Sequence, residues 1–374
     1  PEPVYYAVDV FSRTVGAAAG RGAYAAAAEA DAIVRRVRGR LARMIGANDP
    51  RRIVLTPGGT ESLNLAIQGY VRPGDHVVTT VAEHNSVLRP LAWLRDHAGV
   101  RLTHVPCDQE GYVAAEEIAA AIEVDTRLVA VTHASNVTGA VQPVEAIGAI
   151  CHGRGVALLV DAAQTAGHES IDVTRAGIDL LAAPGHKQLL GPMGTGFLYV
   201  GERVEADLAP LQQGGTGSLS ESDQQPTAMP DRYESGNLNT PALAGLDAGL
   251  KLLASDEWQE LAPQRAAVAE RLQHELAAIE AITLHGPRSA SPRTPVFSFS
   301  MEGYSPQDVA AVLAGRGIAC RAGLHCAGRM HAALGTANHG GAVRLSPGFA
   351  TTLAEVEHVA AALRELASAG ALAR

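Results

Sequence analysis

A lysine between two short apolar segments is the first residue of this sequence that could carry chemistry. Lys187 follows His186 in a turn rich in proline and glycine, which separates the apolar run 178–183 from the run 194–200. Both runs have the length and composition of buried strands. A lysine in such a place either extends to solvent or loses its charge and serves as a nucleophile. Because most lysines are solvated, Lys187 alone favours the first alternative.

A carboxylate upstream reverses that preference. The apolar stretch 158–160 is followed directly by Asp161, and Gln164 comes shortly after it. An acid and an amide are thus placed at the C-terminal end of a strand, where open α/β sheets bind their ligands. An acidic partner for a pyridinium nitrogen, together with a lysine that can form a Schiff base, is what pyridoxal phosphate (PLP) requires of a protein. The sequence therefore predicts PLP as the cofactor.

Three further motifs follow other predicted strands. Gly59 and Thr60 open a helix whose N-terminus favours a phosphate group, although a simple capped helix start explains them equally well. His84 is either a surface histidine or a flat ring that stacks on a cofactor, and Asn136 offers an amide donor. Because right-handed crossovers bring strand-end loops to one edge of a sheet, we expect these side chains to lie near Lys187.

Together, and in their order along the chain, these motifs resemble class V aminotransferase-type PLP enzymes of fold type I. Among these the sequence is most similar to the cysteine desulfurase and selenocysteine lyase family. The resemblance extends from about residue 20 to the last predicted helix, and it is carried by Gly-Thr-Glu-Ser-Leu-Asn, Glu-His-Asn-Ser, Ser-Asn-Val-Thr-Gly, Val-Asp-Ala-Ala-Gln and Gly-His-Lys.

The resemblance implies a role for each matching position. Lys187 would bind PLP covalently, Asp161 would pair with the pyridine nitrogen, and His84 would stack on the ring and take part in catalysis. Gln164 would bind the phenolic oxygen, and Asn136 would lie beside the ring and the substrate carboxylate. The phosphate would be held by Gly59, Thr60, His186 and Thr216.

The loop around Thr216 resembles a segment that the family lends to the neighbouring subunit, which implies a homodimer with shared active sites. The family often has a phosphate-binding serine two residues before its His-Lys pair, whereas this chain has Pro184. Phosphate binding is therefore expected to depend more on Thr60, His186 and Thr216. The Leu-Asp-Asn-Ala-Ala-type N-terminal segment of the family is missing before Pro1, so further upstream residues are expected.

The C-terminal part supplies the residue that separates the possible activities. Cys326 ends the segment Arg321-Ala-Gly-Leu-His-Cys, which resembles the desulfurase loop whose cysteine attacks the substrate sulfur. The short spacing to Arg344 resembles the second, short-loop group of desulfurases. The adjacent imidazole of His325 can favour a thiolate. Arg344 matches the carboxylate-binding arginine of the family, and Arg321 is a second candidate for binding the substrate.

The composition argues against several other classes of protein. A formal net charge of −9 and a pI of about 5.9 argue against a nucleic-acid partner, since no basic stripe is present beyond residues 35–43. No apolar run approaches the roughly 18 residues of a membrane span, and no signal peptide is recognisable. Four cysteines without metal-type spacing predict no metal site and a cytoplasmic location.

A chain of 374 residues is too long for one core, so we expect two domains, 1–243 and 244–374. Alternating strands and helices in the first predict an α/β fold with a mostly parallel seven-stranded sheet. Its strands are expected at 52–56, 76–80, 100–105, 128–132, 156–160, 178–183 and 194–200. Residues 212–240 are expected to form a long functional loop. The second domain is expected to be α+β, with strands at 296–300 and 341–345 and helices at 258–279, 305–316 and 353–367.

The sequence therefore predicts a PLP-dependent cysteine desulfurase that converts L-cysteine to L-alanine, with the sulfur transferred to Cys326 as a persulfide. A sulfur-acceptor protein is the expected further partner. One alternative is a selenocysteine lyase on the same scaffold, and another is a PLP-dependent C–S β-lyase or epimerase. A non-enzymatic relative would be expected to lack Lys187 or Asp161, and both are present.

Overall fold

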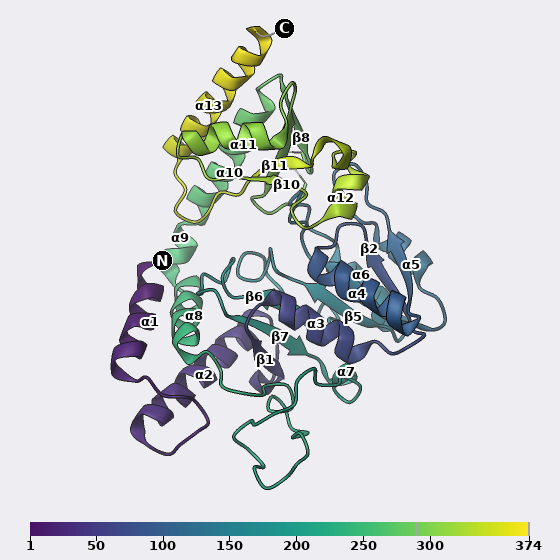
Figure 1. The fold of residues 1–374 in the computed structure, drawn as a ribbon, viewed down its shortest axis with the longest axis vertical. Helices are drawn as coiled ribbons and strands as arrows, with labels where there is room; N and C mark the ends of the chain where they lie inside the picture. The colour runs from purple at the N-terminus through teal and green to yellow at the C-terminus, as the bar shows by residue number, and fades with distance from the viewer. Residues whose placement is uncertain (289–290, 373–374) are drawn as a thin grey trace.

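A seven-stranded sheet forms the centre of the larger part of the molecule (Figure 1). The computed structural model describes residues 1–288 and 291–372. The strand order is β1-β7-β6-β5-β4-β2-β3, and β7 is antiparallel to both of its neighbours while the other pairs are parallel. The bounds are β1 Ile53–Thr56, β2 His76–Thr80, β3 Arg101–Val105, β4 Thr126–Thr132, β5 Ala157–Asp161, β6 Leu180–Pro184 and β7 Gly196–Val200. The predicted mostly parallel α/β sheet is confirmed.

Helices cover both faces of this sheet, which explains why most of its strands are continuous runs of apolar residues in the sequence. Helices α3 and α4 bury leucines and valines in the core on one face, and α2, α5, α6 and α8 close the other. Their bounds are α2 Ala25–Met44, α3 Gly59–Tyr70, α4 Asn85–Ala98, α5 Ala115–Ala121, α6 Val144–Gly153 and α8 Thr240–Leu253. An unpredicted helix, α1 (Glu2–Thr14), packs along α8 (Figure 1).

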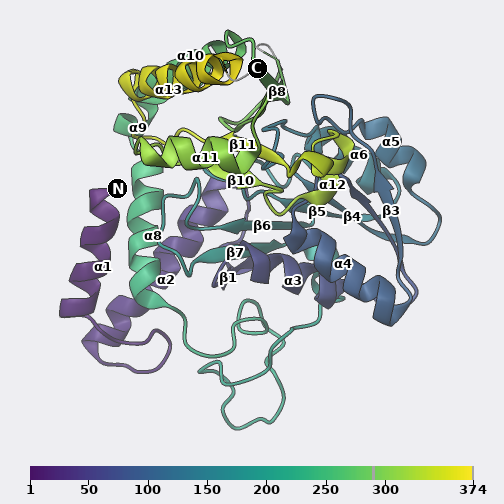
Figure 2. The ribbon, with the colours of Figure 1, turned by 45° about the horizontal axis from the view of Figure 1, so that its top comes forward.

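A second, four-stranded antiparallel sheet lies above the first part, with α10, α11 and α13 packed around its own core (Figures 1 and 2). Its strand order is β10-β11-β9-β8. The bounds are β8 Ile282–His285, β9 Phe297–Met301, β10 Arg321–Gly323, β11 Ala342–Leu345, α10 Ala262–Ala277, α11 Pro306–Gly315, α12 Gly328–Ala333 and α13 Leu353–Leu372. The predicted smaller α+β part is confirmed. The single helix expected over 258–279 is wrong, because Pro263 starts a new helix after α9 (Asp256–Glu260).

The boundary at residue 243 stays a prediction. Helix α8 crosses it, and its buried Leu246 and Leu250 belong to the core of the large sheet. Within the described residues, none of the helices combines the length and apolar character that a bilayer crossing needs.

The segment 206–239, between α7 (Glu202–Glu205) and α8, contains neither helix nor strand and extends away from the second sheet (Figures 1 and 2). It is attached by Glu234, whose carboxylate forms an ion pair with Arg38 of α2 and accepts a hydrogen bond from Leu55 N at 2.6 Å. The side chains of this ion pair are largely buried. The expected long loop is therefore an anchored surface segment.

Candidate active site

The carboxyl ends of β5 and β6 bring the predicted acid and lysine into electrostatic range of each other. Asp161 is the last residue of β5, and Lys187 lies in the turn after β6. Burial raises the pKa of Asp161, and the positive charge of Lys187 opposes that rise. Lys187 is an exposed residue, yet desolvation of its amine lowers its pKa. Asp161 opposes that lowering in turn.

His84 is held at the N-terminus of α4 by its own helix. Its Nδ1 accepts a hydrogen bond from Ser86 N at 3.1 Å and lies 3.0 Å from Ser86 Oγ. Ser86 Oγ also lies 2.9 Å from Thr60 Oγ1 at the start of α3. Burial, followed by the charge of Lys187, lowers the pKa of His84 to about 4, so the ring is neutral near pH 7. Ser86 was not predicted, although it lies within the motif that pointed to His84.

The start of α3 has the features of an anion site. Gly58 at the N-cap has no side chain, so no side-chain oxygen caps the first N–H groups of this helix. A Cβ at Gly59 would lie 3.0 Å from Pro184 Cδ, so the absence of a side chain at Gly59 lets β6 approach. Thr60, in the first turn of this helix, and His186, next to Lys187 in the chain, are both exposed. Gln164, three residues after Asp161, is half-buried.

Cys326 lies in a tight turn between β10 and α12. Its Sγ lies 3.4 Å from Arg321 Nη2. Arg321 of β10 lies directly opposite Arg344 of β11 in the register of these two antiparallel strands. The electrostatic influence of Cys326 reaches both Lys187 and Arg344. The turn thus places the thiol among the predicted substrate arginines and within range of Lys187.

His325 does not act on the thiol as the sequence suggested. Its Nε2 lies 3.2 Å from Arg321 O, and its Nδ1 lies 3.1 Å from His331 Nε2. Its ring is only 1% exposed. Both ring nitrogens are therefore engaged, and the charged group beside Cys326 Sγ is the Arg321 guanidinium instead.

Asn136 joins the large sheet to the Cys326 turn. Its Nδ2 donates to His325 O at 2.7 Å, and its backbone oxygen accepts from Arg344 Nη1 at 2.8 Å. The backbone N–H of Asn85 donates to Cys326 O at 2.7 Å. The carbonyls on both sides of the thiol are thereby fixed to the large part.

Among the described residues, no hydrogen bond joins the Thr216 side chain to this group. It lies in the segment 206–239, which extends away from the second sheet, and its Oγ1 lies 3.0 Å from Ser218 Oγ (Figure 1). Ser218 Oγ donates to Asp231 at 2.6 Å. Its predicted role requires a second subunit and stays a prediction.

Glu83 is a buried acid at the site that sequence reasoning missed, although it precedes His84. Its Oε1 accepts from Thr80 Oγ1 at 2.6 Å and from Thr132 N at 2.9 Å. Its Oε2 has no hydrogen-bond partner among the described residues. Burial raises its pKa to about 8, so Glu83 is mostly protonated at neutral pH.

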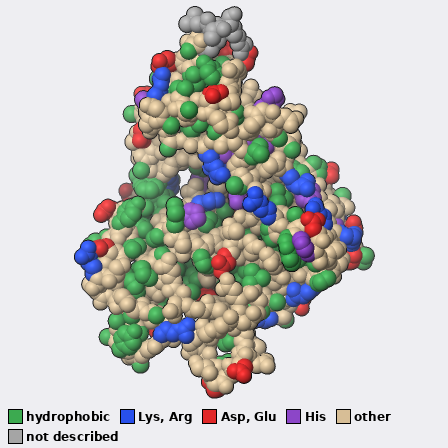
Figure 3. Space-filling model, viewed as in Figure 1, with side chains coloured by type: hydrophobic (Ala, Val, Ile, Leu, Met, Phe, Trp, Pro, Cys, Tyr) green, Lys and Arg blue, Asp and Glu red, His purple; other side chains and the backbone are tan. Residues whose placement is uncertain are grey.

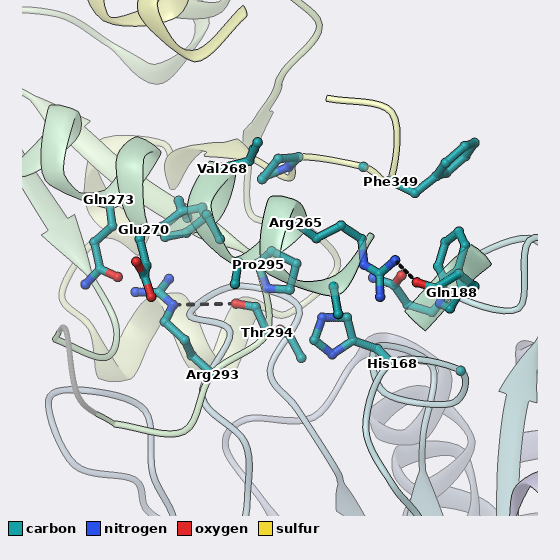
Figure 4. Close-up of a pocket in the computed structure, with 18 of the residues that line it drawn as sticks. His168, Gln188, Arg265, Val268, Glu270, Gln273, Arg293, Thr294, Pro295 and Phe349 are labelled. Carbon is teal, nitrogen blue, oxygen red and sulfur yellow. Dashed lines mark hydrogen bonds between the residues drawn. The ribbon is translucent and has the colours of Figure 1, made fainter. Parts of the chain in front are cut away.

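A cavity of about 460 Å³ lies next to the site, lined by His168 and Gln188 from the large part and by Arg265 and Phe349 from the other (Figure 4). Arg265 stacks over the ring of Trp258, 4.3 Å from its centroid. None of the predicted site residues lines this cavity. Figure 3 shows Lys, Arg and His side chains gathered where the two parts meet.

Comparison with known proteins places this geometry in context. Residues 1–359 match the family model described as Aminotransferase class-V. A protein of Methanothermobacter thermautotrophicus named "Probable cysteine desulfurase" is 36% identical, over 99% of this chain and 92% of its own length. A cysteine desulfurase of an Enterobacter species is 33% identical, over 87% of this chain and 81% of its own.

Solved structures give the same picture. The apo structure of a cysteine desulfurase from Thermococcus onnurineus has a TM-score of 0.92 and 33% identity, and the match covers 99% of this chain and 92% of that one. A cysteine desulfurase of Escherichia coli has a TM-score of 0.87 and 28% identity, with 98% and 91% covered.

Proposed function

The chain belongs to the aminotransferase class-V family, and we propose that it is a PLP-dependent cysteine desulfurase. The observation that carries this proposal is the position of Cys326, whose thiol faces Arg321 and lies within electrostatic range of Lys187. Relatives that cover nearly the whole chain carry the same name.

The residues present fit PLP. The uncapped start of α3, with Gly59 and Thr60, suits a phosphate, and His186 and the partner subunit's copy of the Thr216 loop would complete its binding. Asp161 is a buried acid that can pair with a ring nitrogen, and His84 is a neutral flat ring. Gln164 would bind the phenolic oxygen, and Asn136 would lie beside the ring and the substrate carboxylate. PLP would supply an electron sink for the substrate's Cα once the substrate amine has replaced Lys187, which leaves the lysine amine free.

The substrate carboxylate would bind to the paired arginines. Arg344 Nε is buried and has no hydrogen-bond partner among the described residues, while Nη1 is held by Asn136 O. A buried unpaired donor is costly, and a carboxylate would satisfy it. Arg321, the cross-strand neighbour of Arg344, would provide a second cation. These contacts orient L-cysteine with its side chain toward Cys326.

Lys187 would move the α proton. A lowered pKa increases the fraction of neutral Nζ, which is the form that accepts a proton. The His84 ring is neutral, so it would stack on the cofactor ring and hold it in place rather than compete with Lys187 for this proton.

Cys326 would then receive the sulfur. Its thiolate attacks the sulfur of the substrate, the new S–S bond forms, and the Cβ–S bond breaks with its electron pair left on Cβ. Protonation of Cβ completes L-alanine, and Cys326 holds the sulfur as a persulfide. L-cysteine and one thiol thus give L-alanine and one persulfide, with no external oxidant or reductant. An acceptor protein would take the sulfur from Cys326.

The functional unit would be a homodimer, because the segment 206–239, which carries Thr216, extends away from the second sheet of its own chain (Figure 1). We also propose a cytoplasmic location, in keeping with four cysteines that are all free.

The function is tested by incubation with L-cysteine, L-selenocysteine and cystine, followed by measurement of alanine, pyruvate, sulfide and selenide. Alanine and a Cys326 persulfide from L-cysteine are expected. Turnover of L-selenocysteine alone would indicate a selenocysteine lyase, and pyruvate with ammonia would indicate a β-eliminating lyase.

A further inference from the structure

The turn that presents Cys326 has a backbone conformation that its residues do not favour. Its central residues, His325 and Cys326, have φ angles of 50° and 58°. The turn is closed by a hydrogen bond from Ala327 N to Leu324 O at 2.8 Å. Two consecutive left-handed residues are normally glycine, asparagine or aspartate, because a Cβ crowds the following carbonyl there. Other contacts must therefore hold this turn.

A network of three buried side chains starts at the turn. His325 Nε2 lies 3.2 Å from Arg321 O, and His325 Nδ1 lies 3.1 Å from His331 Nε2. His331 Nδ1 lies 2.7 Å from Thr336 Oγ1. The exposed fractions of His325, His331 and Thr336 are 1%, 0% and 5%. We call these three residues the His-His-Thr network.

The carbonyl at one end fixes the direction of every hydrogen bond in the network. Arg321 O can only accept, so His325 Nε2 carries the hydrogen and donates. In a neutral ring His325 Nδ1 then accepts from His331 Nε2, and His331 Nδ1 accepts from the Thr336 hydroxyl. Burial lowers the pKa of both imidazoles to about 4, so both rings are neutral at physiological pH, as these hydrogen bonds require.

The network acts on two groups next to the thiol. It fixes the ring of His325, which is the residue before Cys326. Through that ring it also holds the carbonyl of Arg321, whose guanidinium lies 3.4 Å from Cys326 Sγ. Asn136 and Asn85 fix the carbonyls of the turn from the opposite side. Without the network, the His325 ring would have no partner for Nδ1, and the turn would be held from one side only.

We propose that the His-His-Thr network holds Cys326 in the position from which its thiol reacts, with His331 as the positioning residue at its centre. The inference rests on the proposed function, since sulfur transfer defines the reactive position. His331 acts on the thiol through His325, so it is a positioning residue and not a catalytic one.

Two substitutions of His331 distinguish the loss of its hydrogen bond to His325 from a change in side-chain volume. His331→Phe keeps a flat ring and removes the donor to His325 Nδ1, whereas His331→Gln keeps an N–H group that can reach the same nitrogen. The control is His76→Phe in β2, because His76 is also 1% exposed and bonded to two threonine hydroxyls. Thr336→Val removes the hydroxyl that donates to His331 Nδ1, and it replaces His331→Phe in the test if that variant does not fold.

Three readouts are needed, and the first two require no turnover. In His331→Phe, amide exchange at residues 325–327 should rise about tenfold or more, as local opening becomes easier. The rate of Cys326 alkylation by iodoacetamide should rise, since a loosened turn exposes the half-buried thiol. The kcat for sulfur transfer should fall about tenfold with KM nearly unchanged. His331→Gln and His76→Phe should resemble the wild type, and Thr336→Val should change in the direction of His331→Phe.

The proposal is overturned if folded His331→Phe, or folded Thr336→Val in its place, keeps the wild-type rates of amide exchange and of Cys326 alkylation. It is also overturned if His331→Gln is as damaging as His331→Phe, or if His76→Phe changes Cys326 equally. Failure of the proposed function would be recognised separately, because the wild type would then form no alanine or persulfide while exchange and alkylation remained measurable.

Discussion

At the scale of single residues, the site is marked by ionisable groups that have lost solvent and by buried polar atoms that lack a hydrogen-bond partner. Lys187, Asp161 and Glu83 are ionisable groups whose pKa values are shifted mainly by loss of solvent. Arg344 Nε and Glu83 Oε2 are buried polar atoms without partners among the described residues. Such groups are costly in a folded protein and gather where a ligand or a reaction uses them.

Glu83 allows a prediction about stability and pH. Its pKa is raised from the usual 4.5 to about 8 in the folded protein, so its contribution to stability is fully present below 4.5 and is lost as the pH rises through 8. The free energy of unfolding of the wild type should therefore fall over this window relative to that of Glu83→Gln, which cannot ionise. Urea unfolding at both ends of the window measures the difference. The exposed Glu116→Gln is the control, and equal slopes for Glu83→Gln and the wild type would contradict the assignment.

The residues that form motifs could be predicted from the sequence, because each lies within a few positions of a strand end. Asp161 ends β5, and Lys187, His84 and Asn136 lie after strands at the same sheet edge, as expected. The link from Asn136 to His325 could not be predicted, because it spans 189 positions and depends on how the two sheets meet. For the same reason the predicted effect of the His325 imidazole on the Cys326 thiol was wrong.

At the scale of elements, the seven central strands could be predicted because apolar runs bounded by glycine and proline are distinctive. Strand β10 was missed because its three residues are polar or small and are defined only by pairing with β11. Strand β8 was missed because none of its four residues is fully buried. Short elements that depend on distant partners leave little local signal.

The start of α3 supports a prediction at this scale. Gly59→Ala would place a Cβ 3.0 Å from Pro184 Cδ and 3.3 Å from Pro184 N, so α3 and β6 must separate slightly. We expect a loss of about 1 kcal/mol in stability from this overpacking, together with weaker retention of PLP. The neighbouring Gly58→Ala is a matched control, since nothing lies within 4 Å of its added Cβ. Thermal unfolding and cofactor absorbance after dialysis measure both effects, and equal behaviour of the two variants would refute the packing argument.

At the scale of the whole molecule, the segment 206–239 explains why a second subunit is expected. It extends from the large part on the side away from the second sheet (Figure 2), and Thr216 has hydrogen-bond partners within its own loop only among the described residues. A loop of this length without secondary structure is usually functional.

The shared site predicts both an oligomeric state and a phenotype. The protein should sediment as a dimer, and Thr216→Ala should retain PLP less well than the wild type because one phosphate donor is lost. Thr227→Ala, an exposed change in the same segment, should retain PLP normally. A monomer with full activity, or equal PLP retention by the two variants, would show that the site is complete within one chain.

The most direct test of the account is the fate of sulfur in Cys326→Ala. This change leaves Lys187, Asp161, His84 and the carboxylate-binding Arg344 in place, so PLP binding and exchange of the substrate's α proton should persist. With L-cysteine, the wild type should form alanine in proportion to a persulfide that peptide mass spectrometry places on Cys326, and the variant should form neither above background. Release of sulfide by Cys326→Ala at the wild-type rate would contradict the desulfurase and establish elimination in its place.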